Sequence, residues 1–431
     1  MLKQININNF KSYKAQVLHL SPLTLMIGAN ASGKSNALEA FRFLCWLSQG
    51  QKLSVLKHRV DDSEQILRGQ VKDLGYLGAE SFQLGCRTDD SVWNQFDVEV
   101  TLRDSELHIT NESIVSPSEG FPLYRVEQPS LGLSTDVRVA YNNFAKGGKK
   151  PQVTCTDQIL IMSQLASSAM FQSGHKKAQV EIPKVTGRLQ KLLENTLFLD
   201  PVPSLMRGES YPEKQLRGDC ANLSGVLYSL WQDSNARPII IEFIKSLPEQ
   251  DVQDIEFFED RRGQVALELI ESFGGQARKY PVELLSDGTL RVLAIAASIL
   301  SAPEGSTVVI EEVDNGVHPS RARQLLATMR EQAESRNVHL LLSTHNPALM
   351  DALPDRSLGD VVFCYRNPEV GDSCLVRLSD LDDYVGLVSQ GPLGELVTNG
   401  VVDRFIKIPV TPDDKKQNAM DWLAKMQGDD Q

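Results

Sequence analysis

An eight-residue loop constrains the fold of this chain more than any other part of the sequence. It reads Gly28-Ala-Asn-Ala-Ser-Gly33-Lys34-Ser35, which fills every fixed position of the G-x-x-x-x-G-K-S phosphate-binding pattern. The apolar run 23–27 precedes it, and a helical pattern over 36–47 follows it. The sequence therefore predicts a buried strand, a phosphate loop and a helix in that order, as part of an α/β fold.

The residue types in this loop point to a nucleoside triphosphate, ATP, bound with Mg²⁺. Glycines let successive backbone N–H groups turn toward the phosphates, and the following helix adds its positive end. Lys34 can reach the β and γ phosphates, and the Ser35 hydroxyl is placed to hold Mg²⁺. The residues that we expect to contact the nucleotide here are Gly28, Asn30, Ser32, Gly33, Lys34, Ser35 and Asn36.

A pair of acids supplies the groups that a phosphate loop needs for hydrolysis. The apolar run 308–310 ends in Glu311 and Glu312. One acid can hold Mg²⁺, and the next can orient and deprotonate the attacking water. We assign the first role to Glu311 and the second to Glu312. The alternative is an exposed glutamate pair at a strand end, which is common in chains without a phosphate loop.

Two further segments place polar groups at the ends of regular elements. The apolar run 340–342 leads into Ser-Thr-His345, where the histidine can contact the γ-phosphate or the attacking water. A histidine bonded only to backbone is the alternative. The segment Leu285-Ser-Asp-Gly-Thr-Leu-Arg291 opens an apolar helix with Ser286 as its N-cap. Free N–H groups at that helix start can bind an anion, although a simple capped helix explains the same residues.

Composition excludes several other classes of protein. No apolar run approaches 18 residues, so we expect no membrane span, and six scattered cysteines indicate a reducing cytoplasm. The net charge of −12 argues against a protein that coats nucleic acid over its whole surface. A local basic groove remains compatible with this charge. The basic segments 146–150 and 175–177 are candidates for contact with nucleic acid, and solvated charged loops are the alternative.

Taken in order, these segments resemble the ATPase head of the ABC type, in the branch that SMC, RecF and OLD-family proteins share. The nearest likeness is to stand-alone bacterial predicted ATPases, often labelled AAA-type. No coiled-coil arm interrupts the chain, and about 85 residues after His345 are too few for an OLD-type nuclease domain plus the closing elements of the head. The segments that carry the resemblance are Asn9-Phe-Lys-Ser12, Gly28 to Ser35, Leu285 to Arg291, Glu311 to Pro319 and Ser343 to Pro347.

The resemblance implies a site shared between two copies of the chain. Two heads would pair head to tail, and each ATP would lie between one phosphate loop and the signature helix of the partner. Glu311-Glu-Val-Asp314 departs from the usual acid-acid-Pro-Glu, and the Ser-Asp-Gly signature disfavours a transport role. The roles implied are Glu312 as catalytic base, His345 as switch histidine, Ser286, Asp287 and Gly288 on the γ-phosphate, Lys11 and Ser12 near the phosphates, and Gln164 as a lid-loop glutamine bearing on Mg²⁺.

The resemblance also predicts the domain organisation and the function. It implies a mixed sheet core with an antiparallel β part and a helical insertion, and Mg-dependent ATP hydrolysis. Head dimers or higher oligomers would control a separately encoded effector, such as a nuclease or toxin, in antiphage defence or DNA repair. The alternative is a nucleotide-gated scaffold, or a DNA-binding assembly protein, with little turnover. The predicted single head (1–431) comprises an N-terminal lobe with the phosphate loop and a β subdomain (1–155), a mainly helical insertion (156–283), a lobe with the signature, acids and histidine (284–370), and closing elements with a tail (371–431).

Overall fold

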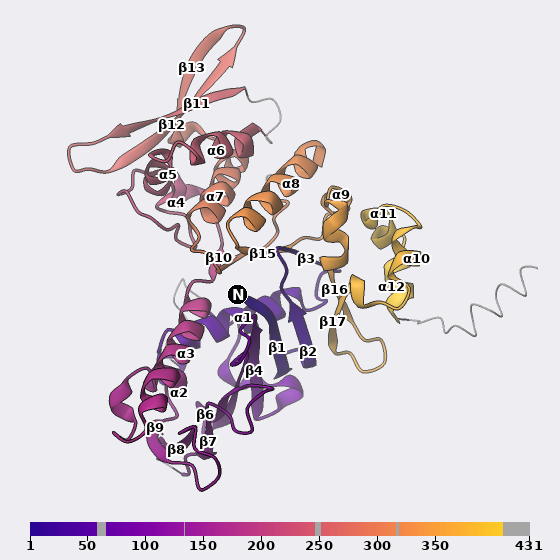
Figure 1. Cartoon of the computed structure of the whole chain (residues 1–431). Helices are drawn as coiled ribbons and strands as arrows, with labels where there is room; N and C mark the ends of the chain where they lie inside the picture. The colour runs from indigo at the N-terminus through magenta and orange to yellow at the C-terminus, as the bar shows by residue number, and fades with distance from the viewer. Residues whose placement is uncertain (58–65, 133, 246–250, 316–318, 408–431) are drawn as a thin grey trace, which may run out of the picture.

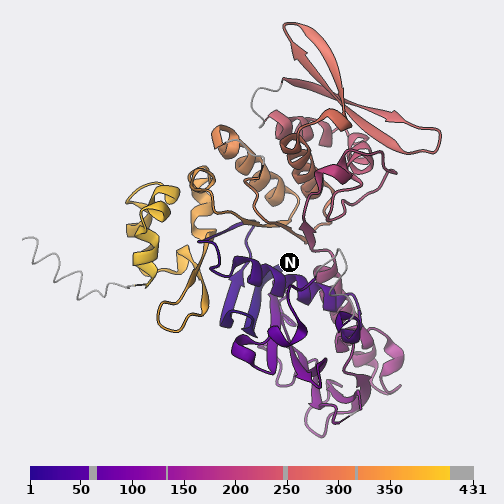
Figure 2. The same ribbon diagram turned by 180° about the vertical axis from the view of Figure 1, so that it is seen from behind.

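The computed structural model describes residues 1–57, 66–132, 134–245, 251–315 and 319–407. Figure 1 shows two lobes on opposite sides of a central sheet, with a group of short helices beside it from the C-terminal part of the chain. The view from behind in Figure 2 shows the same separation of the two lobes. Across these described ranges, no helix is both long enough and apolar enough to cross a membrane.

The lower lobe in Figure 1 is built on an eight-stranded antiparallel sheet of order β2-β1-β4-β5-β6-β7-β8-β9. In β5 every second residue from Phe96 to Val100 is buried, which is the period of a sheet with one covered face. The strands are β1 (Leu2–Phe10), β2 (Tyr13–His19), β4 (Ser81–Thr88), β5 (Gln95–Arg103), β6 (Glu106–Val115), β7 (Tyr124–Gln128), β8 (Asp136–Tyr141) and β9 (Gln152–Thr156).

A six-stranded sheet of order β10-β14-β15-β3-β16-β17 lies between the lobes. Its first five strands run parallel, and β17 pairs antiparallel with β16. Every residue of β3, β14 and β15 is buried, as expected for parallel strands covered on both faces. The strands are β3 (Leu23–Ile27), β10 (Leu197–Leu199), β14 (Thr307–Ile310), β15 (His339–Ser343), β16 (Val362–Arg366) and β17 (Ser373–Arg377).

Each lobe covers one face of the central sheet. Successive residues of β14 belong to different hydrophobic cores, since Val308 packs in the core of the upper lobe and Val309 in that of the lower lobe. The upper lobe also carries a three-stranded antiparallel sheet that projects outward (Figure 1). The helices are α1 (Lys34–Ser48), α2 (Ile161–Gln164), α3 (Lys176–Glu194), α4 (Pro203–Met206), α5 (Leu223–Trp231), α6 (Ala236–Lys245), α7 (Asp287–Ser301), α8 (Pro319–Ser335), α9 (Pro347–Asp351), α10 (Tyr384–Val388), α11 (Leu393–Thr398) and α12 (Val401–Lys407), and the projecting strands are β11 (Val252–Glu259), β12 (Val265–Phe273) and β13 (Gln276–Pro281).

The residues predicted as one helical insertion, 156–283, are distributed over three places. α2 and α3 pack in the lower lobe against β9 and α1, and β10 joins the central sheet. The upper lobe receives α4 to α6 together with the three strands β11 to β13. Helical periodicity shows that one face of a helix is buried, but not which lobe buries it. The sequence analysis therefore assigned to a single insertion helices that lie in different lobes. The predicted tail falls partly in 408–431, outside the described residues.

Candidate active site

The phosphate loop connects β3 to α1, as predicted. Gly28 and Gly33 both have positive φ angles, 145° and 119°, a region that favours glycine. A Cβ atom at Gly28 would overlap the carbonyl oxygen of Cys364, and one at Gly33 would overlap the hydroxyl of Ser373. Both glycines are therefore required by conformation and by the strands β16 and β17 behind the loop.

A buried polar network holds the back of this loop. Tyr13 Oη donates to the carbonyl oxygen of Gly33 at 3.0 Å, and Ser373 Oγ donates to that of Ser32 at 2.7 Å. The Cys364 thiol donates to the same Ser32 oxygen at 3.4 Å, and burial raises the pKa of this thiol, which keeps its proton in place. Tyr13, Cys364 and Ser373 are each fully buried. The carbonyl oxygens of Ser32 and Gly33 are thus hydrogen-bonded to side chains behind the loop. The sequence analysis did not identify Tyr13, Cys364 or Ser373 as part of the site.

Lys34 lies across the loop that precedes it. Its ammonium group donates to the carbonyl oxygens of Gly28 at 2.6 Å and Ala29 at 3.0 Å. Burial lowers the pKa of Lys34, while the negative charge of Glu312 acts in the opposite direction. This interaction brings the predicted phosphate-binding lysine and the predicted catalytic base into one site.

The two predicted acids and the predicted histidine follow neighbouring parallel strands. In the register of the sheet, Ile310 of β14 pairs with Leu342 of β15, which pairs with Leu25 of β3. The segments that begin at Glu311, Thr344 and Gly28 therefore leave the sheet at the same edge, which is where ligands bind in parallel α/β sheets. His345 is exposed there.

Glu312 is held in a turn that is joined to the end of β15. Its φ angle is 49°, its N–H donates to Ser343 Oγ at 3.1 Å, and its carboxylate accepts from Asn315 Nδ2 at 2.9 Å. Thr344, directly after β15, donates through Oγ1 to Asp314 of this turn at 2.5 Å. A non-glycine residue in the left-handed region is a strained position, and such positions concentrate at functional sites.

Glu311 has a cationic neighbour that the sequence analysis missed. Arg42 of α1 lies 3.6 Å from the Glu311 carboxylate, with its guanidinium over the ring of Phe198 at 5.0 Å. Burial raises the pKa of Glu311, and the positive charge of Arg42 opposes this rise. Arg42 occurs inside an amphipathic helix, where an arginine carries no distinctive signal.

Asp200 is a second residue that the sequence did not single out. It directly follows β10, whose Leu199 pairs in parallel with Ile310 of β14, so Asp200 leaves the sheet beside Glu311. Its charge contributes to the raised pKa of Glu311. A short apolar run ending in Asp-Pro was the available signal, but three residues are too few to identify a strand.

A pocket of about 500 Å³ lies beside the phosphate loop and holds three predicted nucleotide contacts, Lys11, Ser12 and Asn36. Asn36 Nδ2 donates to Ser12 Oγ at 2.9 Å. Lys11 donates instead to Glu39 at 2.5 Å and to the carbonyl oxygen of Arg68 at 2.8 Å. Burial lowers the pKa of Lys11, and its contacts with Glu39 act against that shift. Lys11 is therefore paired with a buried acid at the pocket wall.

The signature segment begins α7 with the N-cap that its sequence predicts. Ser286 Oγ accepts from the N–H of Thr289 at 3.1 Å, and Asp287 pairs with Arg207. Ser286 and Asp287 are exposed. Figure 1 places α7 in the upper lobe with α4 to α6, whereas α1 lies in the lower lobe.

Gln164 lies elsewhere. It ends α2 in the lower lobe, where its side chain accepts from the N–H of Thr156 at 2.9 Å and donates to the carbonyl oxygens of Thr156 and Ile159 at 2.8 Å. Its amide group thus joins α2 to the end of β9. The structure does not bring Gln164 to the edge where Glu311 and Glu312 lie, because α2 and β9 belong to the far side of the eight-stranded sheet (Figure 1).

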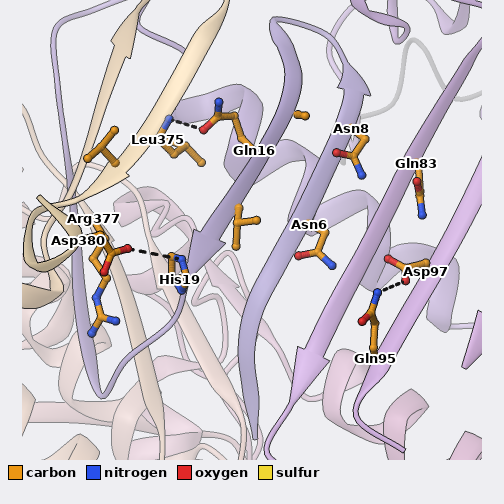
Figure 3. Close-up of a pocket in the computed structure, with 13 residues that line it drawn as sticks. Asn6, Asn8, Gln16, His19, Gln83, Gln95, Asp97, Leu375, Arg377 and Asp380 are labelled. Atoms are coloured by element: carbon orange, nitrogen blue, oxygen red, sulfur yellow. Dashed lines mark hydrogen bonds and ion pairs between the residues drawn. The ribbon is translucent and has the colours of Figure 1, made fainter. Parts of the chain in front are cut away.

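A second pocket, of about 610 Å³, crosses the seam between β2 and β17. Figure 3 shows a row of amide side chains along it, including Asn6, Asn8 and Gln83. Gln16 joins the two sheets by accepting from the N–H of Leu375 at 2.9 Å. None of the predicted site residues lines this pocket, so we leave it outside the candidate site.

The topology and the site together define the class of this protein. A phosphate loop after β3, paired acids after β14 and a histidine after β15 meet at one edge of a parallel sheet that is flanked by an antiparallel sheet. The predicted fold class, an α/β ABC-type P-loop NTPase head with a mixed sheet core and an antiparallel part, is confirmed, whereas the predicted helical insertion is divided among three places. Among the described residues, no group of three or more His, Cys, Asp or Glu side chains is arranged to hold a metal ion.

Comparison with known sequences supports the same class. A family model described as "AAA ATPase domain" matches residues 1–76, which include the phosphate loop. Another, described as "AAA domain, putative AbiEii toxin, Type IV TA system", matches residues 223–351, which include the signature, Glu312 and His345. A Helicobacter pylori protein described as an ATP/GTP phosphatase is 22% identical over 392 residues, covering 89% of this chain and 94% of the relative. Both halves of the site thus lie in segments that match models of AAA domains.

Solved structures of SMC heads are similar to this chain over most of its length. One is an SMC head bound to the C-terminal winged-helix domain of ScpA, with 12% identity, coverage of 87% of this chain and 96% of that chain, and a TM-score of 0.48. Another is the SMC head domain from Thermotoga maritima, with 13% identity, coverage of 87% and 98%, and a TM-score of 0.36.

Proposed function

We propose that this protein hydrolyses ATP in the presence of Mg²⁺, and that two copies of the chain form each complete site. The observation that carries the proposal is the meeting of the phosphate loop, Glu312 and His345 at one edge of the central sheet. The AAA-type sequence matches and the ATP/GTP phosphatase relative support hydrolysis. Because that relative is described with both nucleotides, ATP and GTP are to be compared as substrates.

Different residues of the chain bind the phosphates, activate the attacking water and orient the general base. The bonded loop carbonyls leave the opposite face of the loop for phosphate, and Lys34 supplies a positive charge to the β and γ oxygens. Glu312 accepts the proton of the attacking water as general base. Asn315 donates to one oxygen of Glu312 and fixes its orientation, and His345 contacts the γ-phosphate from the neighbouring strand end.

The residues present fit Mg²⁺, which would neutralise charge on the phosphates when bound. This ion takes oxygen ligands, usually one or two from protein with the rest from phosphate and water. The Ser35 hydroxyl at the start of α1 and the Glu311 carboxylate offer such oxygens. The Glu311 side chain is 40% exposed beside Arg42, which leaves it accessible to a ligand. Gln164 is bonded to backbone within the lower lobe, and Asp200 replaces it in our proposal as the additional polar group beside Glu311.

A second copy of the chain would complete the site. Ser286, Asp287 and Gly288 lie at the exposed start of α7 in the upper lobe, and would meet the γ-phosphate bound to the partner's phosphate loop. Head-to-tail pairing places two such sites in one dimer. ATP binding would then join two heads, and hydrolysis would release them.

We further propose that this cycle controls a separately encoded effector, a nuclease or a toxin. The match to a model described with a putative AbiEii toxin and a type IV toxin–antitoxin system supports a role in defence, and the OLD-like resemblance supports defence or repair. A nucleotide-gated scaffold with little turnover is the second candidate. Its support is the position of Ser286 in the other lobe, since ATP bound between two heads would hold them together without turnover.

Two substitutions separate these candidates. Lys34→Ala removes the phosphate contact and is expected to abolish ATP binding and hydrolysis. Glu312→Gln keeps binding but is expected to lower kcat by at least 100-fold, within the range of general-base contributions. If Glu312→Gln hydrolyses ATP at the parent rate, Glu312 is not the base. If it loses turnover but keeps biological function that Lys34→Ala loses, the scaffold account holds.

A further inference from the structure

Two basic segments that are 25 residues apart in sequence form one surface in the lower lobe. The end of β8 and the N-cap residue of α3 are joined by a hydrogen bond of 2.7 Å between Tyr141 Oη and His175 Nδ1. Lys177 Nζ also lies 4.2 Å from the ring centre of Phe144. We call this surface the lysine patch, and it consists of Lys146, Lys149, Lys150, Lys176 and Lys177.

The lysine patch differs in charge from the rest of the chain. Residues 137–180 hold six Lys or Arg side chains and a single acid, Asp157, in a chain of net charge −12. Asp157 is fully buried and accepts from His108 and Arg103, so it does not neutralise the surface. The acids Asp136 and Glu181 stand just outside this range. Between Asp136 and Glu181 the chain therefore carries an excess of positive charge, in contrast to its net charge of −12.

The arrangement of the lysines is unfavourable for the isolated protein. α3 begins at Lys176 and Lys177, and its first turn contains no acid. Cations at the positive end of a helix are destabilising, whereas anions are stabilised there. Four of the five lysines in the patch are exposed. A polyanion bound across the patch would offset both the mutual repulsion of the lysines and their repulsion by the helix end.

The tip of the β8–β9 loop is open to a ligand. Lys150 Nζ donates to the carbonyl oxygen of Ala145 at 3.1 Å and lies 5.3 Å from the ring centre of Phe121, which folds the loop. Gly147 and Gly148 form the tip, both with positive φ angles and with open space around each Cα. Lys146 and Lys149 flank these glycines, and both are exposed.

We propose that the lysine patch binds the phosphodiester backbone of nucleic acid. Lysines act as point charges that contact phosphate without reading bases, so we expect binding without sequence preference and with strong salt dependence. An anionic membrane also attracts lysines, but it is a less suitable partner because interfacial binding gains much of its strength from buried apolar side chains. Within 137–180, a range that the structure describes in full, Val180 is the one large apolar side chain that is exposed.

The test measures binding of the full chain to a fluorescent 30-base-pair DNA duplex and to a 30-nucleotide single strand by anisotropy, between 50 and 200 mM KCl. The patch variant is Lys146→Gln/Lys149→Gln. The control is Arg261→Gln/Arg262→Gln, which removes two exposed charges from the turn between β11 and β12. Vesicles with and without phosphatidylserine are titrated in parallel.

We expect the parent to bind nucleic acid and the patch variant to bind roughly tenfold more weakly at 50 mM KCl. The salt slope for duplex should fall by about two in the patch variant and stay unchanged in the control. Equal affinity of parent and patch variant, or binding to anionic vesicles and not to nucleic acid, would overturn the proposal. Binding is measured without ATP, and an unchanged ATPase rate and thermal midpoint of the patch variant separate this result from the proposed function.

Discussion

Removal of the Ser373 hydroxyl tests whether the polar network behind the phosphate loop prepares it for nucleotide. Ser373 is fully buried, and its hydroxyl bonds the Ser32 carbonyl oxygen at 2.7 Å and Ser12 Oγ at 2.8 Å. After Ser373→Ala, the Ser32 carbonyl keeps the Cys364 thiol as a weak donor. Loss of a buried bond of this kind costs about 1–3 kcal/mol. If 1–2 kcal/mol of that appears in nucleotide binding, the Kd for ATP rises roughly 5- to 30-fold.

Titration with a fluorescent ATP analogue measures this Kd for the parent, for Ser373→Ala and for Ser379→Ala. Ser379 is an exposed serine six residues further along and serves as the matched control. Urea unfolding of the same proteins shows whether the variant is folded under the binding conditions. If Ser373→Ala loses stability but binds ATP with the parent's Kd, the network supports the fold alone, and our account of the loop is wrong.

Three further predictions concern a buried acid, the cation beside Glu311 and the shared site. Burial raises the pKa of Glu112 to about 7, whereas the unfolded chain releases this proton near pH 4.5. The free energy of unfolding should therefore fall by about 2.5 kcal/mol from pH 5 to 8. Glu112→Gln should remove this part of the pH dependence in urea unfolding. Arg42→Gln removes the cation that opposes the raised pKa of Glu311, so the acid limb of the ATPase pH profile should move to higher pH. An unmoved limb would exclude this role. Lys34→Ala and Ser286→Ala should each be inactive alone, while an equal mixture should regain roughly a quarter of the parent rate through mixed dimers; no recovery on mixing would contradict a shared site.

Local sequence signals predicted those parts of the site that each lie within one short segment of the chain. The phosphate loop and the runs that end at Glu311 and His345 each combine an apolar strand with the residues that follow it. Parallel strands end at one edge, so the sequence was enough to group them. The N-cap role of Ser286 could also be predicted from local sequence, because a cap bonds a backbone N–H only two or three residues further along.

The groups that complete the site come from distant segments with ordinary residue types. Ser373 lies more than 300 residues from the loop carbonyl that it binds, and a serine in a strand carries no signal of this contact. Asp200 follows a strand of three residues, below the length at which alternation can be recognised. Gln164 was assigned from the resemblance alone, and its backbone bonds show why a glutamine after a buried segment can serve packing.

The central claim is that ATP joins two heads, and the mass of the Glu312→Gln protein in solution tests it most directly. With hydrolysis blocked, light scattering should show the mass of one chain without nucleotide and of two chains with Mg-ATP. The same measurement on Glu312→Gln/Ser286→Ala should show one chain under both conditions. A Glu312→Gln protein that binds ATP and keeps the mass of a single chain would contradict the account, as would a dimer of the same mass with and without ATP.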